Sequence, residues 1–210
     1  MSFYANRVFP WILDKTEPKE LSEHRTLALQ GVSGDVLEIG LGTGGNLPYY
    51  PKSIQRLTAV EPSSGMHARA QKRVVETGRD VEWHQTKGEQ LPFGDGRFDT
   101  VVTTLLLCSV DDVDKVLQET FRVLKPGGHY HFLEHVLSKE PETCKWQHRL
   151  NGLHKVVACG CELIKDIEHS IRDSEFDVTE FHEIPLFAGA KAGLDQKIYP
   201  YIRGIARKPV

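Results

Sequence analysis

The chain has 210 residues, of which 40% are hydrophobic and 26% are charged, and its formal net charge is −3 at pH 7. This length suits one domain with its own core, and the composition excludes a wholly disordered, collagen-like or coiled-coil chain. No long basic run occurs, which disfavours nucleic acid as the main partner, because nucleic-acid binding depends on clustered Lys and Arg.

The sequence predicts a protein without a membrane-spanning segment. The longest stretch free of Asp, Glu, Lys and Arg, residues 39–51, is rich in glycine and shorter than the about 20 apolar residues that a spanning helix needs. We expect no secretory signal at the N-terminus. The four cysteines contain no CxxC pair and are typical of free thiols in a reducing compartment. We therefore expect a cytoplasmic location.

Short β-rich runs alternate with helical ones along the chain. We expect strands at residues 35–40, 56–61, 80–86, 98–107 and 129–136, and helices at 63–77 and 111–124. The run 98–107 is nearly continuously apolar, as a strand buried on both faces of a parallel sheet should be. Further on we expect helices near 142–157 and 166–174 and strands at 175–184 and 201–207, joined by a loop at 186–197. The alternation predicts an α/β fold with a doubly wound sheet, whose ligands bind beyond the carboxyl ends of the strands.

A glycine-rich turn follows the first predicted strand. Gly40, Gly42 and Gly45 match the pattern GxGxxG and open what we expect to be the next helical segment. Glycine lets a backbone turn tightly and approach a ligand. Glu61 lies 21 residues after Gly40, at the end of the second strand, where a carboxylate can accept both hydroxyls of a ribose. The spacing alone also fits a nicotinamide oxidoreductase. The alternative without a ligand is a cluster of turn glycines with a surface Glu.

Three motifs distinguish between these alternatives. They are V-L-E-I-G-L-G-T-G at residues 36–44, L-P-F-G-D-G-R-F-D at residues 91–99 and R-V-L-K-P-G-G at residues 122–128. In this order they resemble the motifs of class I S-adenosylmethionine-dependent methyltransferases. The resemblance implies a Rossmann-like sheet of seven strands, mostly parallel with an antiparallel final strand and with helices on both faces. It also implies S-adenosylmethionine as cofactor and S-adenosylhomocysteine as product.

A closer resemblance extends over almost the whole chain. Residues 107–110 (L-C-S-V), 134–136 (E-H-V), 146–147 (W-Q) and 160–161 (G-C) are similar to a subgroup that contains alkyl-thiol methyltransferases. Glu162 stands where this subgroup often has His. The subgroup implies a small, fairly apolar acceptor.

The family resemblance also implies which residues bind the cofactor. The glycine turn would cradle the methionine part, with Glu38 near its amino group, and Glu61 would bind the ribose. The start of the helix after the second strand and the loop after the third would border the adenine, and the end of the fourth strand would face the methionine end. With Glu38 and Glu61, these positions are Gly40, Gly42, Gly44, Asn46, Pro62, Met66, Gly88, Glu89, Gln90, Thr104 and Leu105.

Methyl transfer from a sulfonium is an in-line displacement that depends chiefly on positioning. Ionising a thiol acceptor at pH 7 costs about 2 kcal/mol, whereas an aliphatic hydroxyl costs several times more and needs a base. The sequence shows no unmistakable base, which favours a thiol. The candidate catalytic residues are Glu134 and His135, which end the fifth strand, and Cys108 in the loop after the fourth. The alternative for Glu134 and His135 is a buried side chain with a structural role, and the alternative for Cys108 is a packed, inert thiol.

Cys159 and Cys161, taken with Cys108, raise the alternative of a thiolate cluster for arsenite. A metal site needs a defined number and geometry of ligands, and three dispersed cysteines do not show one. We therefore expect no metal site.

Residues 3–13 are rich in aromatic and aliphatic side chains. We interpret them as an amphipathic lid that closes over cofactor and acceptor and excludes water, with Tyr4 and Arg7 pointing inward. Shallow membrane attachment and a helix packed on the sheet are the alternatives. Trp146, in the helix expected near 142–157, is a further candidate for substrate contact.

These observations predict one methyltransferase domain in three parts: a helical lid at 1–30, a cofactor-binding core at 31–137, and acceptor-side helices with closing strands at 138–210. We expect methyl transfer from S-adenosylmethionine to a small apolar acceptor, preferably a thiol. An O- or N-methyltransferase of a lipid or quinone-like molecule is the alternative, as is a non-catalytic S-adenosylmethionine-binding protein.

Overall fold

Seven strands form one sheet in the order β3-β2-β1-β4-β5-β7-β6. A computed structural model describes residues 4–16, 19–184 and 200–210 of the chain. Strands β1 to β5 pair in parallel, and β7 is antiparallel to both of its neighbours. This confirms the predicted mostly parallel sheet with an antiparallel final strand. The strands are β1 (Gly34–Ile39), β2 (Ile54–Val60), β3 (Val81–His84), β4 (Phe98–Thr104), β5 (Leu124–His135), β6 (Asp177–Ile184) and β7 (Tyr201–Arg207).

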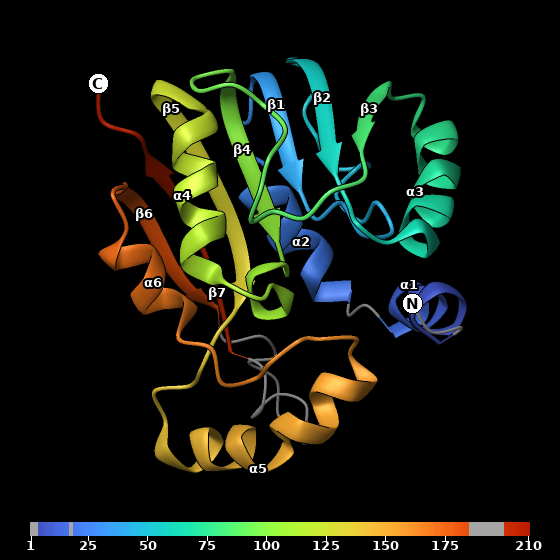
Figure 1. Cartoon of the computed structure of the whole chain (residues 1–210), viewed down its shortest axis with the longest axis vertical. Coiled ribbons are helices and arrows are strands. Elements are labelled where there is room, and N and C mark those ends of the chain that lie inside the picture. The colour runs from blue at the N-terminus through green and yellow to red at the C-terminus, as the bar shows by residue number, and fades with distance from the viewer. Residues whose placement is uncertain (1–3, 17–18, 185–199) are drawn as a thin grey trace.

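Helices cover both faces of this sheet, as predicted. They are α1 (Phe9–Thr16), α2 (Lys19–Ala28), α3 (Ser64–Thr77), α4 (Val113–Val123), α5 (Pro141–Val157) and α6 (Ile167–Asp173). Val116 of α4 and Ile171 of α6 share one buried cluster with Ile39 of β1. Ala70 of α3 packs with Val36, which points to the other face of β1. In Figure 1, α4 and α6 lie in front of the sheet, and α2, which contacts β5 and β7, lies behind it.

The order of the strands fixes where a ligand can bind. The chain starts the sheet at β1, proceeds outward through β2 and β3, and then returns to the other side of β1 with β4. A ligand crevice forms at such a reversal, beyond the carboxyl ends of the strands. Figure 1 shows α1 and α5 below the sheet, on the side where β1, β2 and β4 end.

Local sequence explains the boundaries of the two helices predicted in the first half. The Ser63 side chain accepts a hydrogen bond from the Met66 amide at the start of α3, and Gly78 ends that helix in a left-handed conformation with φ of 64°. The Asp112 side chain accepts from the Lys115 amide at the start of α4. These caps satisfy amides and carbonyls that a helix leaves unpaired at its ends.

Three predicted boundaries were wrong. No helix follows the glycine turn, because residues 42–49 form successive turns, and Pro48 and Pro51 lack the amide hydrogen that a helix would use there. The fourth strand ends at Thr104 rather than at residue 107, since Leu105 has a left-handed backbone with φ of 54°. β5 begins at Leu124 rather than at residue 129. Its pairing with β4 changes register between Leu124 and His129, so residues 125–128 bulge out of the strand. The predicted loop at 186–197 lies outside the described residues.

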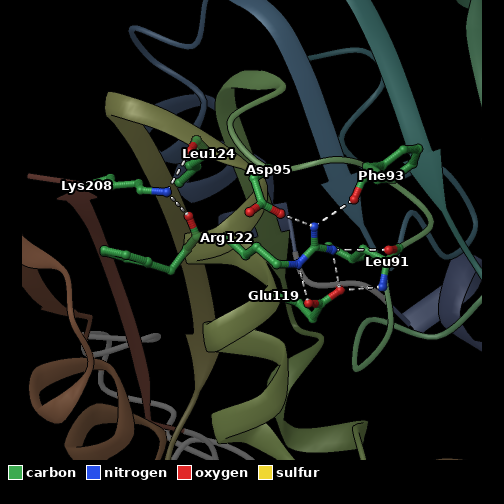
Figure 2. A network of polar contacts seen from close by, with 8 residues as sticks. Leu91, Phe93, Asp95, Glu119, Arg122, Leu124 and Lys208 are labelled. Carbon is green, nitrogen blue, oxygen red and sulfur yellow. Dashed lines mark hydrogen bonds and ion pairs between the residues drawn. The ribbon is translucent and has the colours of Figure 1, made fainter. Parts of the chain in front are cut away.

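The second and third sequence motifs bind each other through Arg122. Its guanidinium donates hydrogen bonds to the carbonyl oxygens of Leu91 and Phe93, to the Asp95 carboxylate and, through two nitrogens, to Glu119. Glu119 also accepts from the Leu91 amide at 2.7 Å. Figure 2 shows how these contacts fasten the loop before β4 onto α4. Through Arg122 the two motifs therefore stabilise the fold.

A second set of contacts holds the bulge that begins β5. Lys125 Nζ lies 2.6 Å from Asp99 Oδ1. From the C-terminal end, Lys208 Nζ donates to the carbonyl oxygens of Phe121 and Leu124 (Figure 2). The last residues of the described chain thereby secure the junction between α4 and β5. Among the described residues, no helix is long and apolar enough to cross a membrane.

Candidate active site

The glycine turn and Glu61 meet at the carboxyl ends of β1 and β2. Glu61 Oε2 accepts a hydrogen bond from the Gly42 amide at 3.0 Å, and its Oε1 accepts from the Ser63 amide at 2.8 Å. Glu61 is only 9% exposed. Burial raises the pKa of this carboxyl, and the two amides oppose that shift. A hydrogen bond thus joins the glycine turn directly to Glu61, which lies 19 residues after Gly42.

The backbone of the turn explains its glycines. Gly40, Gly42 and Gly44 all have positive φ, at 77°, 57° and 83°, which side chains rarely adopt. A Cβ at Gly40 would lie 2.6 Å from Leu106, and one at Gly44 would lie 2.8 Å from Leu47. A Cβ at Gly42 would meet only the Gly40 carbonyl oxygen, at 3.9 Å. Gly42 therefore faces open space beside the Glu61 carboxylate, as a cradle for a ligand requires.

A buried polar network supports the turn from beneath. Glu38 Oε1 accepts from Asn46 Nδ2 at 2.9 Å, and its Oε2 accepts from the Tyr50 hydroxyl at 2.8 Å. Asn46 also donates to Thr104 Oγ1 and accepts from Arg25 Nη1. Burial raises the pKa of Glu38 to about 7, although Tyr50, Asn46 and Arg25 favour the charged form. Three predicted residues, Glu38, Asn46 and Thr104, are therefore in one network.

Sequence reasoning missed two members of this network. Arg25 comes from α2 and Tyr50 from the turns before β2, and neither belongs to a motif. It also missed Arg73 of α3, which donates to the carbonyl and the hydroxyl of Thr43 in the glycine turn. Long-range contacts of this kind leave no local sequence signal.

The predicted adenine-side residues lie at the start of α3, after β2, and in the loop after β3. Met66 is in the first turn of α3, and the Pro62 carbonyl accepts from the Gln85 side chain. The second loop runs through residues 88–90. Its Glu89 side chain accepts from the Asp111 amide at 2.8 Å, and a Cβ on Gly88 would lie 2.9 Å from Ile39. The roles of Pro62, Met66, Gly88, Glu89 and Gln90 beside the adenine stay predictions.

Glu134 fixes the loop after β4. Its Oε2 accepts from the amides of Leu106 and Leu107, both at 3.0 Å, and the side chain is completely buried. These bonds fix the backbone that follows Leu105, whose own conformation is left-handed. Burial raises the pKa of Glu134 to about 8. The geometry favours a positioning role for Glu134 over the predicted one of a base.

The predicted residues Cys108 and His135 are neighbours, and Cys161 joins them. The sulfur atoms of Cys108 and Cys161 lie 3.0 Å apart, and the three side chains offer ligand atoms within 4.8 Å of one another. Contact with Cys161 and burial raise the pKa of the Cys108 thiol well above its usual value, while His135 opposes the shift. The argument that the cysteines are dispersed was wrong for Cys108 and Cys161, although not for Cys159, which is outside this group.

The predicted substrate-binding residues occupy two places. The Tyr4 hydroxyl donates to the Val157 carbonyl of α5 at 2.7 Å, and the π-helical turn Tyr4–Val8 also contacts α3. This segment therefore spans from α3 to α5 across the carboxyl edge, as a lid would. Arg7 is exposed, and Trp146 of α5 is 43% exposed beneath the Arg149 guanidinium. The roles of Tyr4, Arg7 and Trp146 in substrate binding stay predictions.

The sheet topology and the glycine turn joined to Glu61 fit a class I S-adenosylmethionine-dependent methyltransferase, and residues 37–132 match the family described as "Methyltransferase domain". The chain belongs to this family. It is 35% identical over 190 residues to thiol S-methyltransferase TMT1B of Rattus norvegicus, covering 86% of this chain and 74% of that protein. It is 32% identical to human thiol S-methyltransferase TMT1A, covering 85% and 73%.

Solved structures share the fold. A geranyl diphosphate methyltransferase in complex with S-adenosylmethionine superposes with a TM-score of 0.69 at 18% identity, covering 90% of this chain and 84% of that one. A chain from the complex between the Haloferax volcanii Trm112 methyltransferase activator and a methyltransferase superposes with a TM-score of 0.73 at 17% identity, covering 99% of this chain and 96% of that one.

Proposed function

We propose that this S-adenosylmethionine-dependent methyltransferase methylates the sulfur of small, fairly apolar thiols. The observation that carries the proposal is the extent of its similarity to thiol S-methyltransferases. A match over 86% of the chain must include more than half of residues 138–210, which form the predicted acceptor side. The similarity therefore extends beyond the part of the fold that all family members share.

The alternative acceptors have narrower support. A phosphatidylethanolamine N-methyltransferase of Cereibacter sphaeroides is 36% identical over 119 residues, or 55% of this chain. A ubiquinone/menaquinone biosynthesis C-methyltransferase of Desulfotalea psychrophila is 38% identical over 98 residues, or 46% of this chain. The quinone-enzyme match is shorter than the predicted cofactor-binding core at residues 31–137, and the lipid-enzyme match, at 55% of this chain, exceeds the length of that core by fewer than ten residues. Most of each match can therefore come from the part that binds the cofactor, so the two matches favour neither a lipid nor a quinone acceptor.

The residues present fit the cofactor. The Gly42 position is open beside Glu61, whose carboxylate is placed to accept ribose hydroxyls, and the Glu38 network holds the turn in shape. When bound, S-adenosylmethionine supplies an electrophilic methyl group on a sulfonium. The protein's contribution is to hold donor and acceptor in line and to exclude water, which can supply about 7–11 kcal/mol of the barrier.

The acid–base chemistry of the site suits a thiol. Glu134 is completely buried and its Oε2 is engaged by two backbone amides. It is therefore poorly placed to take a proton from a hydroxyl acceptor. A thiol needs little help, because its pKa near 8.5 leaves a few per cent as the nucleophilic thiolate at pH 7.

The test is methyl transfer to matched acceptors. Purified protein with labelled S-adenosylmethionine is given 1-hexanethiol, 1-hexanol and 1-hexylamine, which differ only in the nucleophile, together with phosphatidylethanolamine and a benzoquinol. We expect the methyl thioether as the product, identified by mass spectrometry, and a rate that rises with pH as the thiol ionises. Methylation of the amine, the lipid or the quinol without methylation of the thiol contradicts the proposal, as does transfer to none of the thiols in a wider panel.

The lid gives a second measurement. If residues 4–8 close the acceptor site, Tyr4→Phe removes the hydrogen bond to α5 while keeping the ring. We expect KM for the thiol to rise several-fold and the affinity for S-adenosylhomocysteine to fall by no more than that, since the predicted lid covers both ligands. An unchanged KM for the thiol is the result that contradicts a lid over the acceptor.

A further inference from the structure

The group formed by Cys108, His135 and Cys161 brings three segments of the fold together. Cys108 is in the 3-10 turn Leu107–Ser109 after β4, His135 ends β5, and Cys161 lies in the turns after α5. Cys108 and His135 are buried and Cys161 is half-buried. Two soft thiol ligands and one imidazole thus converge from elements at the same edge of the sheet.

The geometry points to a binding site for a thiophilic divalent cation, specifically Zn²⁺, held by Cys108 Sγ, Cys161 Sγ and one ring nitrogen of His135. Bonds of about 2.3 Å to sulfur in a tetrahedron place two sulfur ligands about 3.8 Å apart. The two sulfur atoms are now 3.0 Å apart, and all three ligand atoms lie within 4.8 Å. The sulfur atoms must therefore move apart by about 0.8 Å to bind the ion, a shift within the range of a small rotation of the two side chains.

Charge balance also favours a divalent cation. Binding replaces the two thiol protons, which are released to solvent, so that two thiolates and Zn²⁺ form a neutral unit in a largely buried place. An isolated thiolate would be costly there, because burial disfavours charge. Glu134, the neighbouring carboxyl of β5, uses one oxygen to bind two amides of the loop after β4. Because Cys108 is in the same loop, this carboxyl also lies close to the proposed ion.

The surroundings hold the ligands in place. The Cys108 carbonyl accepts from the Glu162 amide at 2.8 Å, which ties the two cysteine-bearing segments together. Ser109 Oγ lies 3.5 Å from Cys108 Sγ, within reach of a hydrogen bond to a thiolate. The Tyr201 ring packs edge-on against His135 with 5.8 Å between centroids. Outer contacts of this kind orient metal ligands.

The ligand set departs from that of an arsenite site. Arsenite prefers three thiolates, but Cys159, the third cysteine considered for such a cluster, is outside the group. Two sulfurs and one nitrogen instead make a three-residue zinc set, which leaves one tetrahedral position for water or another small ligand. The proposal does not depend on which acceptor the enzyme methylates.

The test titrates the reduced, metal-free protein with Co²⁺ and then with Zn²⁺. Thiolate ligands give Co²⁺ an intense charge-transfer absorption, and Zn²⁺ then displaces it. We expect one equivalent to bind and two protons to be released. Cys161→Ala, a change at a half-buried turn residue, should weaken binding at least tenfold and abolish the band. Cys159→Ala, two residues away on the same turn, should leave both unchanged.

Two results would overturn the proposal. One is Co²⁺ binding without a thiolate band, or with equal affinity in wild type and Cys161→Ala. The other is a wild-type protein that binds no Co²⁺ when reduced and forms a Cys108–Cys161 disulfide in air, which identifies the pair as a redox couple. His135→Gln, checked by thermal unfolding, provides a second variant and should also weaken Co²⁺ binding at least tenfold.

Discussion

Replacing Glu61 by Ala tests the joint between the glycine turn and β2. The change removes two hydrogen bonds, from the amides of Gly42 and Ser63, and with them the acceptor proposed for the ribose. A buried donor left unpaired costs about 1–3 kcal/mol. Because the side chain lies at the edge of an open cradle, water can replace part of the loss. We expect the free energy of unfolding to fall by about 2 kcal/mol for both bonds together.

The two consequences of this change are measured separately. For a chain of this size, about 2 kcal/mol lowers the melting temperature by roughly 4–8 °C. Losing charge-assisted bonds to the ribose, worth about 1.5–3 kcal/mol, should weaken S-adenosylhomocysteine binding about 10- to 150-fold in calorimetry. Glu82→Ala, which removes an exposed carboxylate from β3, is the control and should change neither by much. Unchanged affinity in Glu61→Ala would show that the ribose is held elsewhere.

Three further perturbations follow from the structure. Gly42→Ala should lower the free energy of unfolding by about 1 kcal/mol, because its backbone is left-handed, and should lower cofactor affinity more than tenfold in calorimetry. Gly78→Ala is the control, since Gly78 has a similar φ and open surroundings. It should lower the free energy of unfolding by the same amount and leave cofactor affinity unchanged. Because the folded state raises the pKa of Glu134 from 4.5 to about 8, it binds a proton that the unfolded chain has lost, so stability should fall as pH rises from about 4.5 to 8. Glu134→Gln should reduce that fall in urea unfolding, and an unchanged slope would contradict the burial argument. Arg122→Lys keeps the charge but loses most of the contacts in Figure 2 and should lower the free energy of unfolding by about 1–3 kcal/mol, with little effect on cofactor affinity.

Local patterns predicted the parts of this protein that depend on local chemistry. The strands, the helices α3 and α4, and the glycine turn with its carboxylate are each determined by residues near in sequence or by one regular spacing. The helix expected after the turn was wrong because Pro48 and Pro51 lack the amide hydrogens that a helix needs there.

The remaining errors concern contacts between distant segments. Nothing near Arg25 indicates that its guanidinium reaches Asn46, and nothing near Cys161 indicates that its sulfur, and not that of Cys159, lies beside Cys108. Such pairings depend on how α2 and α5 dock against the sheet. The sequence could therefore identify a cofactor site and could not assemble its supporting network.

The contact between Arg25 and Asn46 has a consequence for how this enzyme can be divided. The stretch recognised as a methyltransferase domain begins at residue 37, yet a cation next to its most buried acid comes from helix α2, which precedes that stretch. A fragment cut at the conventional border would retain Glu38 and Tyr50 without this neighbouring charge. Any chimaera that borrows the nucleotide-binding half should therefore carry the preceding helix with it.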